Sequence, residues 1–142
     1  APWTWPAVRA FADSDQQGPN PRRHPEAQAA YESYKEWIEE HGLTNPGYII
    51  RYAEWSTDGH ALEPNLVPYH LESGISHWVL WHHPERICEG DAELDRDAEL
   101  AHVRRLLAET GATARPEEVA LYQNVPGNRS MPTIAHSQVF FR

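Results

Sequence analysis

The sequence predicts an α+β fold in which helices pack on an antiparallel sheet. Two observations lead to this prediction. Segments with helical periodicity are interspersed with short apolar runs that end at turn residues. The last two of these runs lie close together in the chain, so we expect the strands they form to pair antiparallel. The length of 142 residues suits one domain of ordinary size, and we assign residues 1–142 to it.

Three segments are predicted to be helical: residues 5–13, 26–41 and 92–110. Pro6 fits the first turn of the first of them. In the second, apolar and aromatic side chains recur at the i, i+3, i+4 and i+7 spacing of one helix face. In the third, Asp91 is a suitable N-terminal cap, a leucine-rich stripe follows, and Gly111 ends the helix.

Four segments are predicted to be strands: residues 48–55, 76–82, 118–124 and 133–141. The first lies between the turn residues 45–47 and the Asp58-Gly59 pair. The second, SHWVLWH, is the most apolar short run of the chain and stops before Pro84, which indicates a buried strand. Residues 56–74 are rich in turn formers and are assigned no strand.

The composition narrows the function classes. Twelve basic and 21 acidic residues give a net charge of −9, which disfavours a nucleic-acid polymer or an anionic membrane as partner. A small phosphorylated ligand is still allowed, because a few local arginines suffice to bind it. No apolar run reaches membrane-spanning length and no signal peptide is visible, so we expect a cytoplasmic protein. Six Trp and nine His suit a polar pocket with aromatic walls.

Metal binding is not expected from the spacing of the candidate ligands. The single cysteine, Cys88, excludes a disulfide framework and a cysteine-based zinc site. No His-Glu-x-x-His helix is present, and we therefore predict no cofactor and no metal. A site built from His70, His77 and either His83 or His136 remains an alternative, since folding can join distant strands.

The C-terminal strand carries the most informative polar pattern. Because alternate residues of a strand share a face, Ile134, His136, Gln138 and Phe140 lie on one side. The loop before this strand holds further polar residues, which together can bind a phosphate beside a nucleophile: Asn124, Arg129 and Ser130. The plainer interpretations of the same pattern are a solvated histidine on an exposed strand face and a histidine that bonds a backbone carbonyl.

Two other residues are candidates for the same site. His77, at the start of the buried run, can pair across the sheet with the site residues. Arg23 precedes the helix over 26–41, where the helix dipole favours a phosphate. The plainer interpretations are a buried histidine bonded to the backbone and a solvated arginine.

Three stretches resemble the family of the fungal N-acetylglucosamine-induced proteins: HWVLWHHP at 77–84, NVP at 124–126 and RSMPTIAHSQVFFR at 129–142. The resemblance covers most of the second half of the chain. It implies membership of a family whose biochemistry is largely undefined.

The second half also resembles the histidine-triad (HIT) proteins, which bind nucleotides. The strand HWVLWHHP, the helix over 92–110, Asn124 and the closing Arg142 follow the order of that family. The resemblance implies that His136 is the nucleophile, that Gln138 replaces the third histidine and Ile134 the first, and that Ser130 contacts phosphate. His136 would attack an α-phosphorus to form a nucleotidyl-histidine, without a metal.

The resemblance leads to a functional expectation with alternatives. We expect a protein that binds a nucleotide or nucleotide sugar, either a nucleotidyl transferase or hydrolase or a former enzyme of this type. The missing first histidine favours instead a non-catalytic binding or regulatory module on the same fold. A His-ligated metalloenzyme is the third alternative. Homodimers are common among histidine-triad proteins, so a homodimer is compatible with the resemblance.

Overall fold

The structure is a computed structural model that describes residues 1–14, 22–66, 68–87, 92–111, 118–124 and 133–142. Its centre is one antiparallel sheet with the strand order β1-β2-β4-β3. The strands are β1 (His60–Pro64), β2 (Ser76–His82), β3 (Val119–Tyr122) and β4 (His136–Phe141). The predicted buried strand over 76–82 is confirmed, as is the antiparallel pairing of the last two strands. These two strands are shorter than the predicted 118–124 and 133–141.

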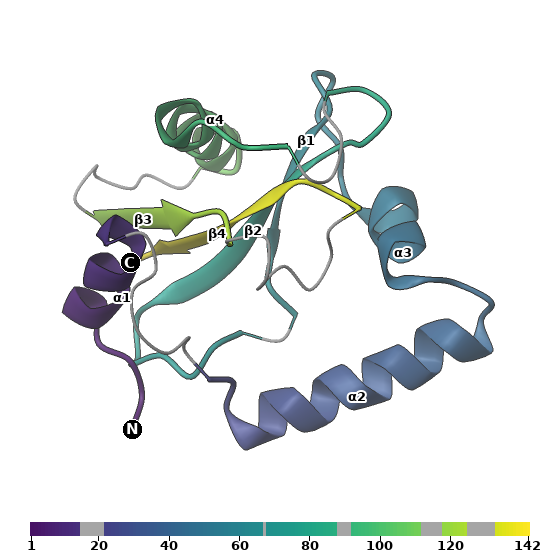
Figure 1. Cartoon of the computed structure of the whole chain (residues 1–142), viewed down its shortest axis with the longest axis horizontal. Coiled ribbons are helices and arrows are strands. Elements are labelled where there is room, and N and C mark those ends of the chain that lie inside the picture. The colour runs from purple at the N-terminus through teal and green to yellow at the C-terminus, as the bar shows by residue number, and fades with distance from the viewer. Residues whose placement is uncertain (15–21, 67, 88–91, 112–117, 125–132) are drawn as a thin grey trace.

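Helix α4 (Arg96–Glu109) covers one face of the sheet (Figure 1). Its apolar stripe packs on the β2 and β4 residues of that face, and Leu80, Val103 and Val139 are fully buried there. The helix begins later than predicted, because Asp95 rather than Asp91 is its N-cap and accepts a hydrogen bond from the Ala98 amide.

Helix α1 (Trp5–Asp13) lies on the opposite face, beside β3 (Figure 1). Thr4 caps it and Pro6 lies in its first turn, as predicted. Phe11 packs edge-on against Tyr122 of β3, with 5.2 Å between the ring centroids. The helix thereby covers one end of this face, while the other end meets two further helices.

These two helices are α2 (Pro25–Glu40) and α3 (Asn45–Tyr52). Helix α2 agrees with the predicted helix over 26–41, but the predicted strand over 48–55 is wrong. Thr44 caps α3 by accepting a hydrogen bond from the Gly47 amide at 3.1 Å, and Pro46 occupies its first turn. Strand β1 lies instead within the turn-rich segment 56–74.

The error has a physical origin in the packing of α3. Some of its apolar and aromatic side chains face the sheet and others face solvent. The sequence therefore lacks the single apolar stripe that predicts a helix. Ile49 packs on the cluster around Ala61 and Trp81, whereas Tyr52 is exposed. Among the described residues, no helix is both long enough and apolar enough to cross a membrane.

Candidate functional site

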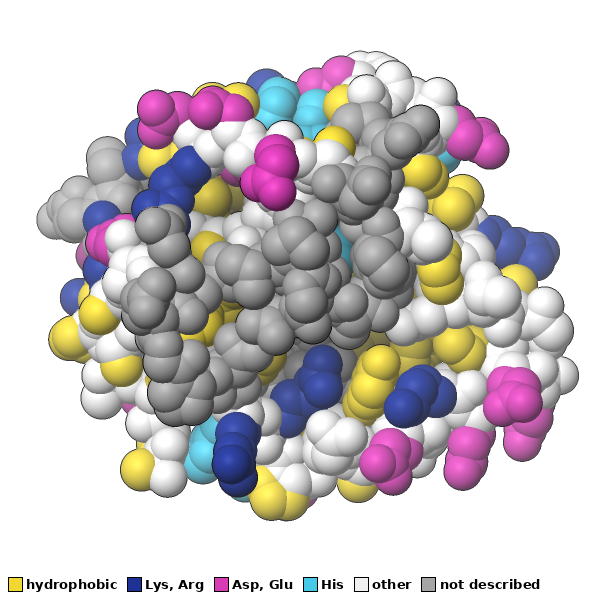
Figure 2. Space-filling model, in the orientation of Figure 1, with side chains coloured by type: hydrophobic (Ala, Val, Ile, Leu, Met, Phe, Trp, Pro, Cys, Tyr) yellow, Lys and Arg dark blue, Asp and Glu magenta, His cyan; other side chains and the backbone are white. Residues whose placement is uncertain are grey.

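A cavity of about 820 Å³ lies on the sheet face that carries α2 and α3. The sheet contributes its floor through Val79 and Trp81 of β2 and through His136 and Gln138 of β4. Asn124, two residues beyond β3, also lines it. Figure 2 shows Lys and Arg side chains next to hydrophobic ones on the α2 side of the molecule. A volume of this size accommodates a nucleotide-sized ligand.

Strand register explains why the predicted residues converge. His136 pairs with Trp81, and Gln138 pairs with Val79, so all four side chains point to the same face. The predicted alternation of His136, Gln138 and Phe140 is therefore confirmed, and His136 is buried rather than solvated on an open strand. Arg129 and Ser130 lie outside the described residues.

The position of His136 is determined by a local hydrogen bond. Its Nδ1 lies 2.7 Å from the Ile134 carbonyl oxygen, which can only accept, so Nδ1 carries the proton and donates. The neutral ring then has its lone pair on Nε2. The Trp81 ring packs beside it, with 4.8 Å between the centroids. This tautomer makes Nε2 the nucleophilic or accepting nitrogen of a cavity-lining histidine.

His77 lies behind Gln138 and does not line the cavity. Its Nδ1 accepts a hydrogen bond from the Tyr69 amide at 3.2 Å, so its proton is on Nε2. That Nε2–H donates to Gln138 Oε1 at 2.7 Å, and the Asn65 amide approaches the same oxygen at 3.5 Å. The Gln138 NH₂ is thus the group that Gln138 offers to a ligand. The predicted contact of His77 across the sheet is present, and His77 holds the Gln138 amide in this orientation.

Burial keeps His77 neutral, because desolvation lowers its pKa from 6.5 to about 4. The unfolded chain binds a proton there near pH 6.5, while the folded chain does so only near pH 4. The unfolded state therefore binds more protons between these values, and folding stability decreases as pH falls from 6.5 to 4.

We expect His77→Gln to remove this part of the pH dependence. Relative to the variant, the natural protein should lose roughly 3 kcal/mol of unfolding free energy between pH 6.5 and 4. Urea unfolding at pH values from 7 to 4 measures the difference. His41→Gln, at the exposed C-terminal end of α2, is the matched control. Parallel profiles for His77→Gln and the natural protein would contradict the assignment.

Two arginines line the cavity just before α2. The Arg23 guanidinium lies over the Tyr31 ring, 4.8 Å from its centroid, and Arg22 is its neighbour in the chain. Guanidinium groups bind phosphate and carboxylate oxygens in a bidentate geometry. Because the chain as a whole carries a net charge of −9, two arginines beside one cavity mark the place where an anionic group is favoured.

Tyrosines of α2 and α3 form the wall of the cavity opposite the sheet. This tyrosine wall was not predicted from the sequence. Tyr34 and Tyr48 meet edge-on with 5.3 Å between centroids, and Tyr52 packs on Tyr48 at 4.9 Å. Tyr34 donates a hydrogen bond to Asn45 Oδ1, and desolvation raises its pKa to about 12, so its hydroxyl stays neutral. The signal was present in Thr44 and Pro46, which are typical of a helix start.

The fold and the cavity define an α+β protein whose open antiparallel sheet forms the floor of a polar, aromatic-walled cavity. Residues 4–142 match the family model for a protein of unknown function named DUF3605, and the chain belongs to this family.

A solved structure of similar fold is the crystal structure of a protein named HTC1. The two share 22% sequence identity with a TM-score of 0.64, and the match covers 98% of this chain and 84% of that one. No curated protein matches the sequence significantly.

Proposed function

We propose that this protein binds a nucleotide or nucleotide sugar in the cavity between the sheet and α2–α3, and that His136 is its nucleophile. The observation that carries the proposal is the His136 tautomer within an arginine-bearing cavity. A nitrogen with a lone pair in the same cavity as two guanidinium groups suits attack on a phosphorus that those groups hold. This is the histidine-triad type of site suggested by the C-terminal strand.

The residues of the cavity have distinct parts in this proposal. Arg22 and Arg23 bind phosphate oxygens, and the Gln138 NH₂, directed by His77, donates to another oxygen. The tyrosine wall stacks on the planar base. His136 Nε2 attacks the α-phosphorus, the bond to the leaving group breaks, and the nucleotidyl-histidine is then transferred to water or another acceptor. Arg129, Ser130 and Asn124 complete the phosphate contacts that the resemblance implies.

A non-catalytic binding module is the second candidate, and one observation favours it. Ile134, at the place of the first histidine of the triad, is fully buried against the apolar cluster around Trp81. An apolar side chain there offers no proton transfer. In this candidate the same cavity binds the same ligand without turnover.

We further propose that the protein belongs with the N-acetylglucosamine-induced proteins and is located in the cytoplasm. Its partner is a small phosphorylated ligand rather than a nucleic-acid polymer or a membrane. A homodimer is compatible with this setting.

Ligand binding is tested by thermal unfolding with a panel of nucleotides and nucleotide sugars. A ligand at one hundred times its Kd should stabilise the fold by about 2.7 kcal/mol, a Tm increase of several degrees. Arg23→Gln should reduce the increase strongly. Arg86→Gln, which removes an exposed arginine outside the cavity lining, should preserve it.

The proposal fails if no member of the panel changes Tm at millimolar concentration. An equal reduction of the ligand-induced Tm increase in both arginine variants would show that binding depends only on the net charge of the protein. Binding by non-phosphorylated sugars alone would remove the role assigned to Arg22 and Arg23.

A further inference from the structure

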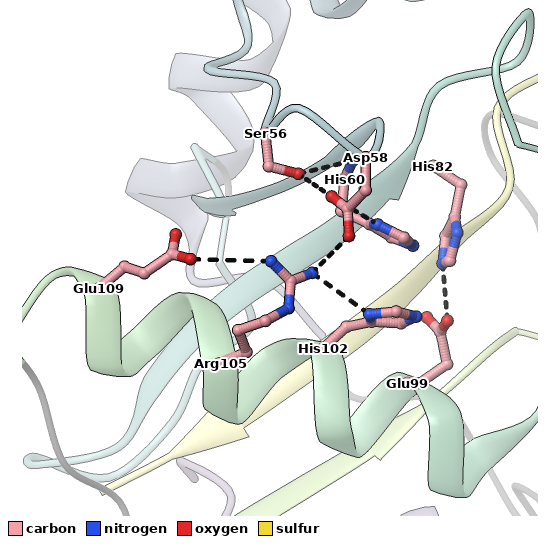
Figure 3. A network of polar contacts seen from close by, with 8 residues as sticks. All are labelled: Ser56, Asp58, His60, His82, Glu99, His102, Arg105 and Glu109. Atoms are coloured by element: carbon pink, nitrogen blue, oxygen red, sulfur yellow. Dashed lines mark hydrogen bonds and ion pairs between the residues drawn. The ribbon is translucent and has the colours of Figure 1, made fainter.

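A second group of polar residues lies on the other face of the sheet, under α4, away from the cavity (Figure 3). Asp58 precedes β1, His60 is the first residue of β1, and His102 lies in the middle of α4. One ligand atom from each of these three side chains lies within 4.8 Å of the other two. We name this group the Asp58 cluster.

Rigid elements bring the cluster together. The His60 and His102 rings are stacked with 3.9 Å between centroids, so β1 and α4 meet at this point. His60 Nδ1 lies 3.2 Å from Asp58 Oδ1. Ser56 in turn donates a hydrogen bond to that carboxylate, which orients it. Two of the three residues belong to regular elements and the third is held by its neighbour, so β1 and α4 fix where the three side chains start.

The donor set is suited to a transition-metal ion. Two imidazoles and one carboxylate are ligands of Zn²⁺ and related divalent ions, whereas Ca²⁺ and Mg²⁺ prefer oxygen alone. Ligand atoms about 2 Å from a tetrahedral ion are roughly 3.3 Å apart. Because an ion bound by an imidazole nitrogen lies in the plane of that ring, the stacked His60 and His102 rings must rotate out of their stack to bind one ion together. Asp58 is exposed, so water can reach the fourth position.

Arg105 already places a positive charge at the mouth of the cluster. Its Nη2 lies 2.9 Å from Asp58 Oδ2 and 3.3 Å from His102 Nδ1. The same guanidinium has another partner one turn further on, since its Nη1 lies 3.7 Å from Glu109 Oε1. A bound cation would repel Arg105 from Asp58, and Glu109 is in place to receive it.

We propose that Asp58, His60 and His102 bind one divalent transition-metal ion of the Zn²⁺ class in competition with the Arg105 guanidinium. The ion joins β1 to α4 and stabilises their packing. The site is independent of the His136 cavity, which lies on the opposite sheet face. It departs from the prediction of no metal, which rested on local spacing, and it uses none of the histidines of the metal alternative: His77 is hydrogen-bonded to Gln138, and His70 packs on His24.

The test is titration of the metal-free full chain with Zn²⁺ by calorimetry, and with Co²⁺ by visible absorption. We expect one equivalent to bind, with an increase in Tm. His102→Asn and Asp58→Asn should each weaken binding by at least about tenfold, as loss of a ligand requires. Arg105→Gln should tighten it by on the order of tenfold, because a like charge is removed nearby. His41→Asn, on the exposed end of α2, is the matched control.

Far-UV circular dichroism of each variant shows that it is folded before titration. Absence of stoichiometric Zn²⁺ binding to the natural chain overturns the proposal. Equal affinity for the natural chain, His102→Asn and Asp58→Asn also overturns it, because the ion is then adventitious. Weaker Zn²⁺ binding to Arg105→Gln than to the natural chain would contradict the competition between the ion and the Arg105 guanidinium. Arg105 would then have only a structural role, in its ion pair with Asp58.

Discussion

His136→Asn is expected to reduce covalent labelling by a nucleotide with a radiolabelled α-phosphate to background. Asparagine keeps a polar side chain of similar reach but has no nucleophilic nitrogen, so the nucleotidyl-histidine cannot form. Turnover should decrease by at least about 10³-fold, as for other covalent nucleophiles. Acid-labile label on the natural protein, quantified after denaturing electrophoresis, is the measurement.

The controls separate chemistry from folding. His70→Asn removes a half-buried histidine that does not line the cavity, and this variant should be labelled as strongly as the natural protein. Binding of unlabelled nucleotide to His136→Asn, measured by thermal shift, should persist because Arg22 and Arg23 remain. Absence of label on the natural protein, with binding intact, would reject the nucleophile and leave the non-catalytic module.

Glu99→Ala is expected to destabilise the fold by about 1–3 kcal/mol. The Glu99 carboxylate is buried in α4, with Oε1 2.7 Å from His82 Nε2 and Oε2 accepting a hydrogen bond from the Ser137 hydroxyl at 2.7 Å. Alanine leaves the buried Ser137 hydroxyl without its acceptor and removes the carboxylate that lies against the His82 ring, and water cannot replace either contact in the core. Figure 3 shows Glu99 reaching His82 from the helix.

Urea unfolding of Glu99→Ala beside Asp97→Ala gives a matched comparison. Asp97 is an exposed carboxylate in the same first turn, so its removal tests the helix dipole alone and should cost about 0.3–1 kcal/mol. Glu99→Gln retains an acceptor and should be intermediate. A loss for Glu99→Ala no greater than for Asp97→Ala would show that the buried contacts contribute little.

Local patterns predicted those elements whose periodicity agrees with their packing. Strand β2 is apolar on both faces because helices lie on both sides of it, and it was predicted with its correct bounds. Helix α2 has a regular stripe and was also predicted. Helix α3 was read as a strand, because its eight residues span barely two turns and its aromatic residues point in different directions.

The candidate site was predictable in part for the same reason. Alternation along β4 placed His136 and Gln138 on one face without knowledge of any other element. The tyrosine wall required α3 to be a helix, and the Asp58 cluster required His102 to meet His60 of β1 across 41 intervening positions of the chain. No local spacing contains that information.

The sequence by itself determined the α+β class, the central strand pair and the common face of His136 and Gln138, since each depends on propensity and periodicity within a few residues. Only the tertiary structure decided what surrounds them. The proton of His77 is on Nε2 because the Tyr69 amide occupies Nδ1, and the cavity is enclosed by side chains of α2, α3 and the sheet, which are distant from one another in the chain. Such contacts join residues distant in sequence, and their geometry follows from the packing of whole elements.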